Sequence, residues 1–117
     1  WFQSFGFKHG ISVDADFVFD VRVLPNPYYD PKLRPLGGNS APVRAFLEAD
    51  LNVARMVDDI ASFLLRWLPT FSGDLRAAVN VAIGCTGGQH RSVYVAHELA
   101  QRFGTNEQVI VRHRDLT

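Results

Sequence analysis

The stretch VAIGCTGGQHRS, residues Val81–Ser92, decides the fold. Its first residues end a near-continuous apolar run, Ala77–Ile83, which is typical of a strand buried on both faces in a parallel sheet. A glycine-rich turn follows. Ser92–Phe103 then carries apolar residues at helical spacing, and Gly104 ends that pattern. A strand, a tight turn and a helix in this order predict an α/β unit.

The turn has the composition of a loop that binds an anion. The first N–H groups of a helix have no partner within the helix, and together with the helix dipole they favour negative charge. Gly84, Gly87 and Gly88 let the backbone approach a phosphate-sized group closely. The polar side chains of the stretch are those of Cys85, Thr86, Gln89, His90, Arg91 and Ser92. The sequence therefore predicts a phosphate site here, and a turn that is rich in glycine only for packing is the alternative.

Two strands are predicted before this unit and one after it. Phe2–Phe7 alternates aromatic with small or polar residues, and a basic pair follows it. Phe17–Val23 places four apolar side chains on one face, those of Phe17, Phe19, Val21 and Val23. The last strand is expected over Gln108–His113. The predicted fold is α/β, a small and mainly parallel sheet with helices packed on it, in a single domain over residues 1–117.

The connection between the second strand and the apolar run is long. Its first part, Leu24–Pro42, contains five of the six prolines and predicts an ordered loop or lid, because proline removes the donors that a ladder or helix needs. A short helix is expected over Pro42–Ala49. A longer helix is expected over Leu51–Leu68, where apolar residues share one face, and Pro69 is expected to end it.

Composition narrows the class of protein. Twelve basic and twelve acidic residues balance, so no overall field favours nucleic acid or an anionic membrane. The single cysteine excludes an internal disulfide and favours a reducing, cytoplasmic setting. No apolar stretch approaches the roughly 18 residues of a membrane span, so we expect a soluble protein. Because the chain begins with Trp1, we also expect it to be a domain of a longer protein.

One catalytic alternative follows from the spacing CxxGxxRS, filled by Cys85, Gly88, Arg91 and Ser92. It is similar to the signature of cysteine-dependent phosphatases, in which a thiolate attacks phosphorus and an arginine binds the phosphate oxygens. Gly84 stands where such enzymes have histidine. The candidates for the general acid that this chemistry needs are Asp14, Asp20 and Asp30.

No cofactor and no metal are predicted. The turn lacks the lysine of the Walker nucleotide loop, because Arg91 precedes the hydroxyl residue. Cys85, His9, His90 and His113 lack the paired spacing of zinc ligands.

Most of the chain resembles the C-terminal domain of the RNase adapter protein RapZ family. The matching stretches are SFGFKHG at Ser4–Gly10, DADFVFDVRVLPNP at Asp14–Pro27, YDPKLRP at Tyr29–Pro35, VAIGCTGGQHRSVYVA at Val81–Ala96 and RHRDL at Arg112–Leu116. The resemblance implies a small α/β unit likened to part of a phosphofructokinase. It also implies a regulatory domain that senses glucosamine-6-phosphate and binds small RNAs, presenting one of them to ribonuclease E. The family's P-loop kinase-like domain and the basic tail of its enterobacterial members are not in this chain.

The resemblance also directs the choice of site residues. We expect a binding domain more than an enzyme, with a phosphorylated small molecule as ligand, a small RNA and an RNA-processing or signalling protein as partners, no membrane contact, and assembly into homo-oligomers. The predicted ligand-binding residues are His9, Arg22, Asn26, Cys85, Thr86, Gly87, Gly88, Gln89, His90, Arg91 and Ser92. An ion pair of Arg22 with Asp20 or Asp30 is the alternative for that arginine. Further contacts to RNA or phosphate are expected from Lys8, Arg34, Arg112, His113 and Arg114.

Overall fold

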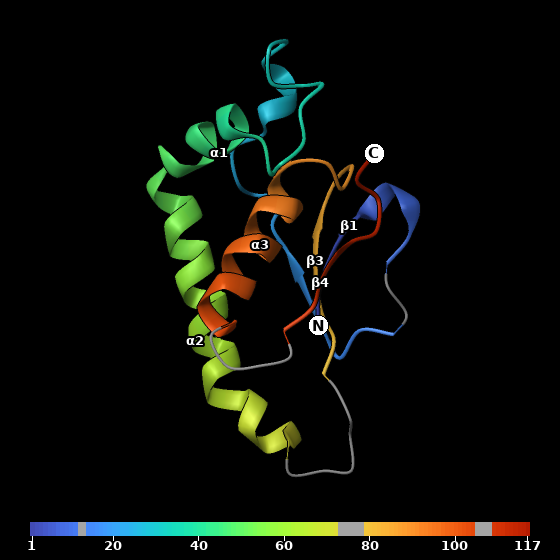
Figure 1. The fold of residues 1–117 in the computed structure, drawn as a ribbon, viewed down its shortest axis with the longest axis vertical. Helices are drawn as coiled ribbons and strands as arrows, with labels where there is room; N and C mark the ends of the chain where they lie inside the picture. The colour runs from blue at the N-terminus through green and yellow to red at the C-terminus, as the bar shows by residue number, and fades with distance from the viewer. Residues whose placement is uncertain (12–13, 73–78, 105–108) are drawn as a thin grey trace.

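The computed structural model describes residues 1–11, 14–72, 79–104 and 109–117. In this part of the chain a four-stranded sheet has the order β2-β3-β1-β4. Its strands are β1 (Phe2–Gly6), β2 (Phe17–Asp20), β3 (Val81–Cys85) and β4 (Val111–His113). Every neighbouring pair is parallel, which confirms the predicted α/β class (Figure 1).

The register brings the carboxyl ends of three strands to one edge of the sheet. Gly6 of β1 lies opposite Cys85 of β3, and Asp20 of β2 lies opposite Gly84. The turns that follow β1, β2 and β3 therefore leave from the same edge, at the top of Figure 1. In open parallel sheets this is the edge at which ligands bind.

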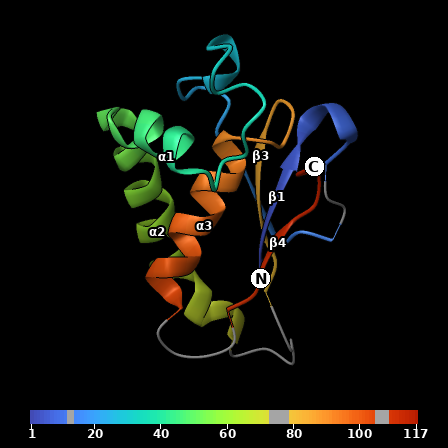
Figure 2. The same ribbon diagram turned by 45° about the horizontal axis from the view of Figure 1, so that its top comes forward.

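Three helices lie on one face of the sheet: α1 (Ala41–Glu48), α2 (Leu51–Ser72) and α3 (Arg91–Phe103) (Figures 1 and 2). Helix α3 packs directly on β1 and β3, and α2 packs outside α3 and against β2. At the β2 contact the Phe63 ring meets the rings of Phe17 and Phe19 edge to face, each at 5.6 Å between centroids. The core between the layers is built from apolar side chains that are fully or almost fully buried, among them Val43, Leu47, Leu64, Ile83, Val95 and Leu99.

The opposite face of the sheet carries no α-helix in the described ranges. Gln3 lies beside Ala82 and Arg112, and Ala82 lies beside Val18, so these four side chains form one row across the strands. Towards the carboxyl edge the face is covered by the ring of Phe7, which packs against Phe5 at 4.9 Å between centroids. Among the described residues no helix has the length and apolar character needed to cross a membrane.

Two expectations about the ends of elements are wrong. The second strand ends at Asp20, and Val23 is 80% exposed, because the chain turns through a Leu24 N–H to Val21 C=O bond directly after the strand. Pro69 lies inside α2, which continues to Ser72. In the last turn a proline removes only one donor, and the Thr70 hydroxyl donates to the Trp67 carbonyl there.

The other elements differ from expectation by a few residues. Strand β3 and helix α3 continue into the expected turn from both sides, so the turn itself shortens to Thr86–His90. The lid contains one turn of 3₁₀ helix at Pro27–Tyr29, called η2. The predicted starts of the third and fourth strands, at residues 77 and 108, lie outside the described residues.

Candidate anion-binding site

The turn Thr86–His90, which we call the anion loop, carries a series of unpaired donors. Within the described residues, the backbone N–H groups of residues 86–90 donate to no protein acceptor. The next N–H groups are those of the first turn of α3, where the first intrahelical bond runs from Tyr94 N–H to His90 C=O. The positive end of the helix dipole adds to these donors, and the arrangement suits an anion.

Glycines let the anion loop lie directly on the end of β1. Gly88 has φ +78°, and a Cβ at this position would lie 2.7 Å from the Gly6 nitrogen. A Cβ at Gly6 would in turn overlap the Gly87 carbonyl. A larger residue at either position would push the two backbones apart, so both glycines are required by the close approach.

Gly84 has a different role, which concerns the phosphatase alternative. A Cβ at this position would lie 2.5 Å from the rings of both Phe5 and Phe7. The place where cysteine-dependent phosphatases carry histidine is therefore filled by two aromatic rings.

A pocket of about 320 Å³ lies over the anion loop. Its lining residues come from the turns after all three strands, and they are Lys8, Asn26, Tyr28, Tyr29, Cys85, Thr86, Gly87, Gln89, His90 and Arg91. The Lys8 N–H donates to the Thr86 carbonyl at 3.2 Å, and its ammonium nitrogen lies 4.0 Å from the position of a Cβ on Gly87. Lys8 therefore places a positive charge beside the unpaired amides.

Arg91 lies beneath the anion loop, with only 5% of its surface exposed. Its Nη1 donates to the carbonyls of Arg22 at 2.6 Å and Leu24 at 3.2 Å, and its Nη2 donates to the Thr86 hydroxyl at 3.4 Å. Its Nε is buried and has no partner among the described residues. The guanidinium thus joins the turn after β2 to the loop, and its charge is held under the pocket floor.

Residues 24–40, the part of the expected lid that precedes α1, pack against the start of α3. His90 is buried, and its Nε2 lies 3.2 Å from the Arg34 carbonyl. The Gly38 N–H donates to the Gln89 carbonyl at 2.7 Å, and a Cβ at Gly38 would overlap the His90 carbonyl. Near the other end of the lid, the Asn26 side chain accepts from the Tyr28 N–H at 3.1 Å and so begins η2. This turn brings the two exposed tyrosine rings to the pocket rim.

Four predicted ligand residues lie outside the pocket lining: His9, Arg22, Gly88, which packs on β1, and Ser92, which is bonded to Cys85. The Arg22 side chain forms an ion pair with Asp20 at 2.7 Å and lies over the Phe7 ring at 4.1 Å, so the ion-pair alternative describes it. The hydrogen bond from Arg22 holds the pKa of Asp20 below its usual range. His9 is exposed in the 3₁₀ turn Phe7–His9 and contributes its carbonyl to Arg114 at 3.4 Å.

The basic residues considered for RNA or phosphate contacts point in several directions. The Arg34 Nε donates to the Tyr28 carbonyl at 2.8 Å and its guanidinium covers the Tyr28 ring, so it supports the lid internally. His113 Nδ1 lies 2.8 Å from the buried Ser4 hydroxyl, and burial lowers the pKa of this histidine. The Arg114 Nη2 donates to the Gly10 carbonyl at 2.6 Å. Arg112, His113 and Arg114 therefore do not form a cluster, because each of the three side chains lies in a different environment.

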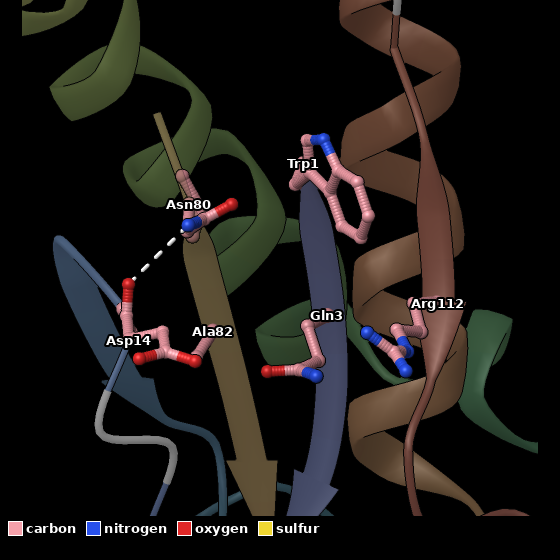
Figure 3. Close-up of a pocket in the computed structure, with 8 residues that line it drawn as sticks. Trp1, Gln3, Asp14, Asn80, Ala82 and Arg112 are labelled. Atoms are coloured by element: carbon pink, nitrogen blue, oxygen red, sulfur yellow. Dashed lines mark hydrogen bonds between the residues drawn. The ribbon is translucent and has the colours of Figure 1, made fainter. Parts of the chain in front are cut away.

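Arg112 lines a second hollow, of about 390 Å³, on the uncovered face of the sheet (Figure 3). Figure 3 shows its guanidinium beside Gln3, with Trp1 above and Asp14 across the floor formed by Ala82. The Asn80 side chain donates to the Asp14 carbonyl at 3.3 Å at this rim. This hollow lies away from the carboxyl edge and contains none of the loop amides, so the smaller pocket is the better anion site.

The Cys85 thiol donates to the Ser92 hydroxyl at 3.1 Å, and both side chains are buried. The three candidate acids are placed elsewhere: Asp14 in the second hollow, Asp20 in its ion pair, and Asp30 as acceptor of the Lys32 N–H. No aspartate or glutamate is among the described residues that line the pocket. The described residues also contain no group of three or more His, Cys, Asp or Glu side chains placed to hold a metal ion.

Comparison with known proteins places these residues in context. The family model described as RapZ C-terminal domain matches residues 1–117. A nucleotide-binding protein of Methylobacillus flagellatus is 64% identical over 116 residues, which cover 98% of this chain and 41% of that protein. Proteins of the same description from Paraburkholderia phymatum and Burkholderia multivorans are 63% and 61% identical, each over 97% of this chain and 38% of the relative. The chain thus spans about two fifths of the length of the curated relatives it matches.

Proposed function

The chain belongs to the RapZ C-terminal domain family, and on that premise we propose that it is a regulatory domain that binds a phosphorylated small metabolite over the anion loop. One observation carries the proposal: in the part of the chain that the structure describes, the five successive backbone N–H groups of residues 86–90, at the start of α3, have no protein acceptor, and the Lys8 ammonium lies beside Gly87. A phosphate group accepts several hydrogen bonds at once and carries the charge that the helix dipole favours.

The ligand that we propose is a sugar phosphate, with glucosamine-6-phosphate as the first candidate. A volume of about 320 Å³ lies at the small end of the range of ligand pockets, which suits a monosaccharide phosphate. Its phosphate would lie over Gly87, and the sugar would extend towards Asn26 and the tyrosines of η2. The relatives are named nucleotide-binding proteins, so a nucleotide is the competing ligand, with its base against the exposed Tyr29 ring.

Calorimetry with four compounds tests this proposal. Glucosamine-6-phosphate should bind more tightly than inorganic phosphate, glucosamine should show no binding, and adenosine monophosphate serves as the nucleotide. The Lys8→Met variant should weaken phosphate binding about 10-fold, the lower end of the range for one hydrogen bond to a charged group. Lys32→Met is the matched control, because Lys32 is the second lysine of the chain and lies outside the pocket lining. Equal affinity of all three proteins for glucosamine-6-phosphate would place the ligand elsewhere.

We further propose that the bound metabolite is reported to a small RNA or to a protein partner. The net charge of zero makes any RNA contact local, through phosphate contacts that weaken as salt rises. A gel shift with a structured small RNA at low and at moderate salt, with and without glucosamine-6-phosphate, measures this directly. No shift in any of the four conditions would remove RNA from the function of this chain and leave the protein partner.

A further inference from the structure

The anion loop is held from its far side by the segment Arg114–Thr117. The Gln89 side chain donates to the Asp115 carbonyl at 2.7 Å, and its Oε1 accepts from the Thr117 N–H at 3.2 Å and hydroxyl at 3.3 Å. Gln89 is thus tied to this segment by three hydrogen bonds. The sequence predicts Gln89 as a ligand-binding residue, but its side-chain amide is already hydrogen-bonded within the protein.

Asp115 contacts both backbones that meet at the site. Its Oδ2 accepts from the Gly6 N–H at 2.8 Å, at the end of β1. A Cβ at Gly88 would lie 2.9 Å from the Asp115 Cβ, so the aspartate packs directly against the left-handed residue of the loop. Gly6 and Gly88 are themselves in close contact, and Asp115 lies against both of them.

The position of Asp115 is fixed by its neighbour. Arg114 pairs with the Asp115 carboxylate at 2.9 Å and donates to the Gly10 carbonyl, and its own N–H donates to the Ser4 carbonyl at 3.0 Å. Burial works to raise the pKa of Asp115, but the hydrogen bonds from Arg114 and Gly6 outweigh it, and the pKa lies below its ordinary value. The carboxylate is therefore charged at neutral pH.

We propose that Asp115 is a positioning residue of the anion site, which fixes the Gly87–Gly88 backbone through Gly6 so that the loop amides converge on one point. The inference rests on the proposed function. It runs against simple electrostatics, because a carboxylate near a bound phosphate repels it. If Asp115 acts only by charge repulsion, its removal should tighten phosphate binding. If it positions the loop, its removal should weaken binding. The two explanations therefore predict opposite changes in phosphate affinity.

Nuclear magnetic resonance titration with inorganic phosphate, followed at the Gly87 and Gly88 amides, separates them. Asp115→Ala should weaken binding about 10-fold, as expected for the loss of a hydrogen bond to a charged group. Asp115→Asn keeps an acceptor for the Gly6 N–H and should restore most of the affinity. Asp58→Ala is the control, because Asp58 also forms an ion pair with an arginine, Arg102, between α2 and α3. Unchanged or tighter binding in Asp115→Ala would overturn the proposal.

A second measurement keeps the inference separate from the proposed function. Without any ligand, hydrogen exchange should be faster in Asp115→Ala than in the wild type at two amides, that of Gly6, which donates to Asp115, and that of Lys8, which donates to the Thr86 carbonyl of the loop, while exchange in β3 stays the same. An unchanged rate at Lys8 would refute positioning, whether or not phosphate binds. If the wild type shows no phosphate response but these rates differ, the proposed ligand is wrong and the positioning role stands. If Asp115→Ala fails to fold, Gln89→Ala removes the other contact with this segment and should raise the exchange rate at the Lys8 amide.

Discussion

The thiol of Cys85 donates to the hydroxyl of Ser92 at 3.1 Å, from the last residue of β3 to the second residue of α3. With Cys85 only 2% exposed, this bond lies under the anion loop and joins its two ends. Cys85 thereby has a structural role that needs no reactive thiolate, whereas the sequence alone leaves a catalytic role open.

The first prediction concerns this cysteine. Cys85→Ser should retain the affinity for glucosamine-6-phosphate within about 2-fold, because a hydroxyl can replace the thiol as donor to Ser92, and it should cost about 1 kcal/mol of unfolding free energy. Calorimetry and urea unfolding measure the two effects. If the wild type hydrolyses an aryl phosphate and Cys85→Ser does not, a role as a sensor alone is wrong and the phosphatase alternative is supported.

Arg91→Ala should both unfold more easily and lose phosphate binding. The variant leaves the carbonyls of Arg22 and Leu24 without their donor beneath the loop, which corresponds to about 3 kcal/mol. The control is Arg102→Ala, whose exposed ion pair with Asp58 contributes less than about 1 kcal/mol. Urea unfolding of both variants checks the difference. Similar midpoints for the two would show that the buried guanidinium does not hold the site together.

Two glycines with positive φ form a matched pair for the third prediction. Gly88→Ala adds a Cβ that lies 2.7 Å from the Gly6 nitrogen, whereas Gly10→Ala, at φ +92°, adds one with no neighbour within 4 Å. Backbone strain of about 1 kcal/mol applies to both, and the overlap applies only at Gly88. Gly88→Ala should therefore be the less stable and should lose phosphate binding. Equal melting temperatures would mean that the loop and β1 can separate freely.

The fourth prediction is a pH dependence from His113. Burial lowers its pKa below 6.5 in the folded state, so the unfolded chain binds the proton more readily. Stability from this group is fully present above pH 6.5 and falls as the pH drops from there towards the lowered value. The melting temperature should decrease between pH 7.5 and 5.5, and His113→Gln should reduce that decrease. The lowered carboxylate pKa values of Asp20 and Asp115 lie below this window. An unchanged slope in His113→Gln would assign the dependence to another group.

Local patterns predict the fold and the loop well. The apolar run, the glycines and the helical spacing of Ser92–Phe103 are short-range patterns, and they predict β3, the turn and α3, which the structure begins one residue earlier, at Arg91. Strand ends are less well determined: the alternation up to Val23 continues in the sequence after the chain has already turned at Asp20.

The side-chain arrangement of the site depends on contacts between distant residues, and these leave no local pattern. Arg22 and Arg91 are both arginines near the carboxyl edge, yet one lies on the outer face with Asp20 and the other lies buried under the loop. The contact of Asp115 with Gly6 joins positions 109 residues apart. The sequence shows Tyr28 and Tyr29 only as two aromatic residues of the lid, and the fold brings them to the pocket rim.

The parallel order of the strands also has an evolutionary consequence. The three turns that form the pocket leave from three different strands, so each can change in sequence or length without a shift in the register of the sheet. In the proposed site the loop would contact the charged group of the ligand mainly through backbone amides, and the segment around Tyr28 and Tyr29 would contact the rest of it. Divergence of that segment is therefore expected to change which molecule is recognised, while the loop backbone that would bind the charged group keeps its shape.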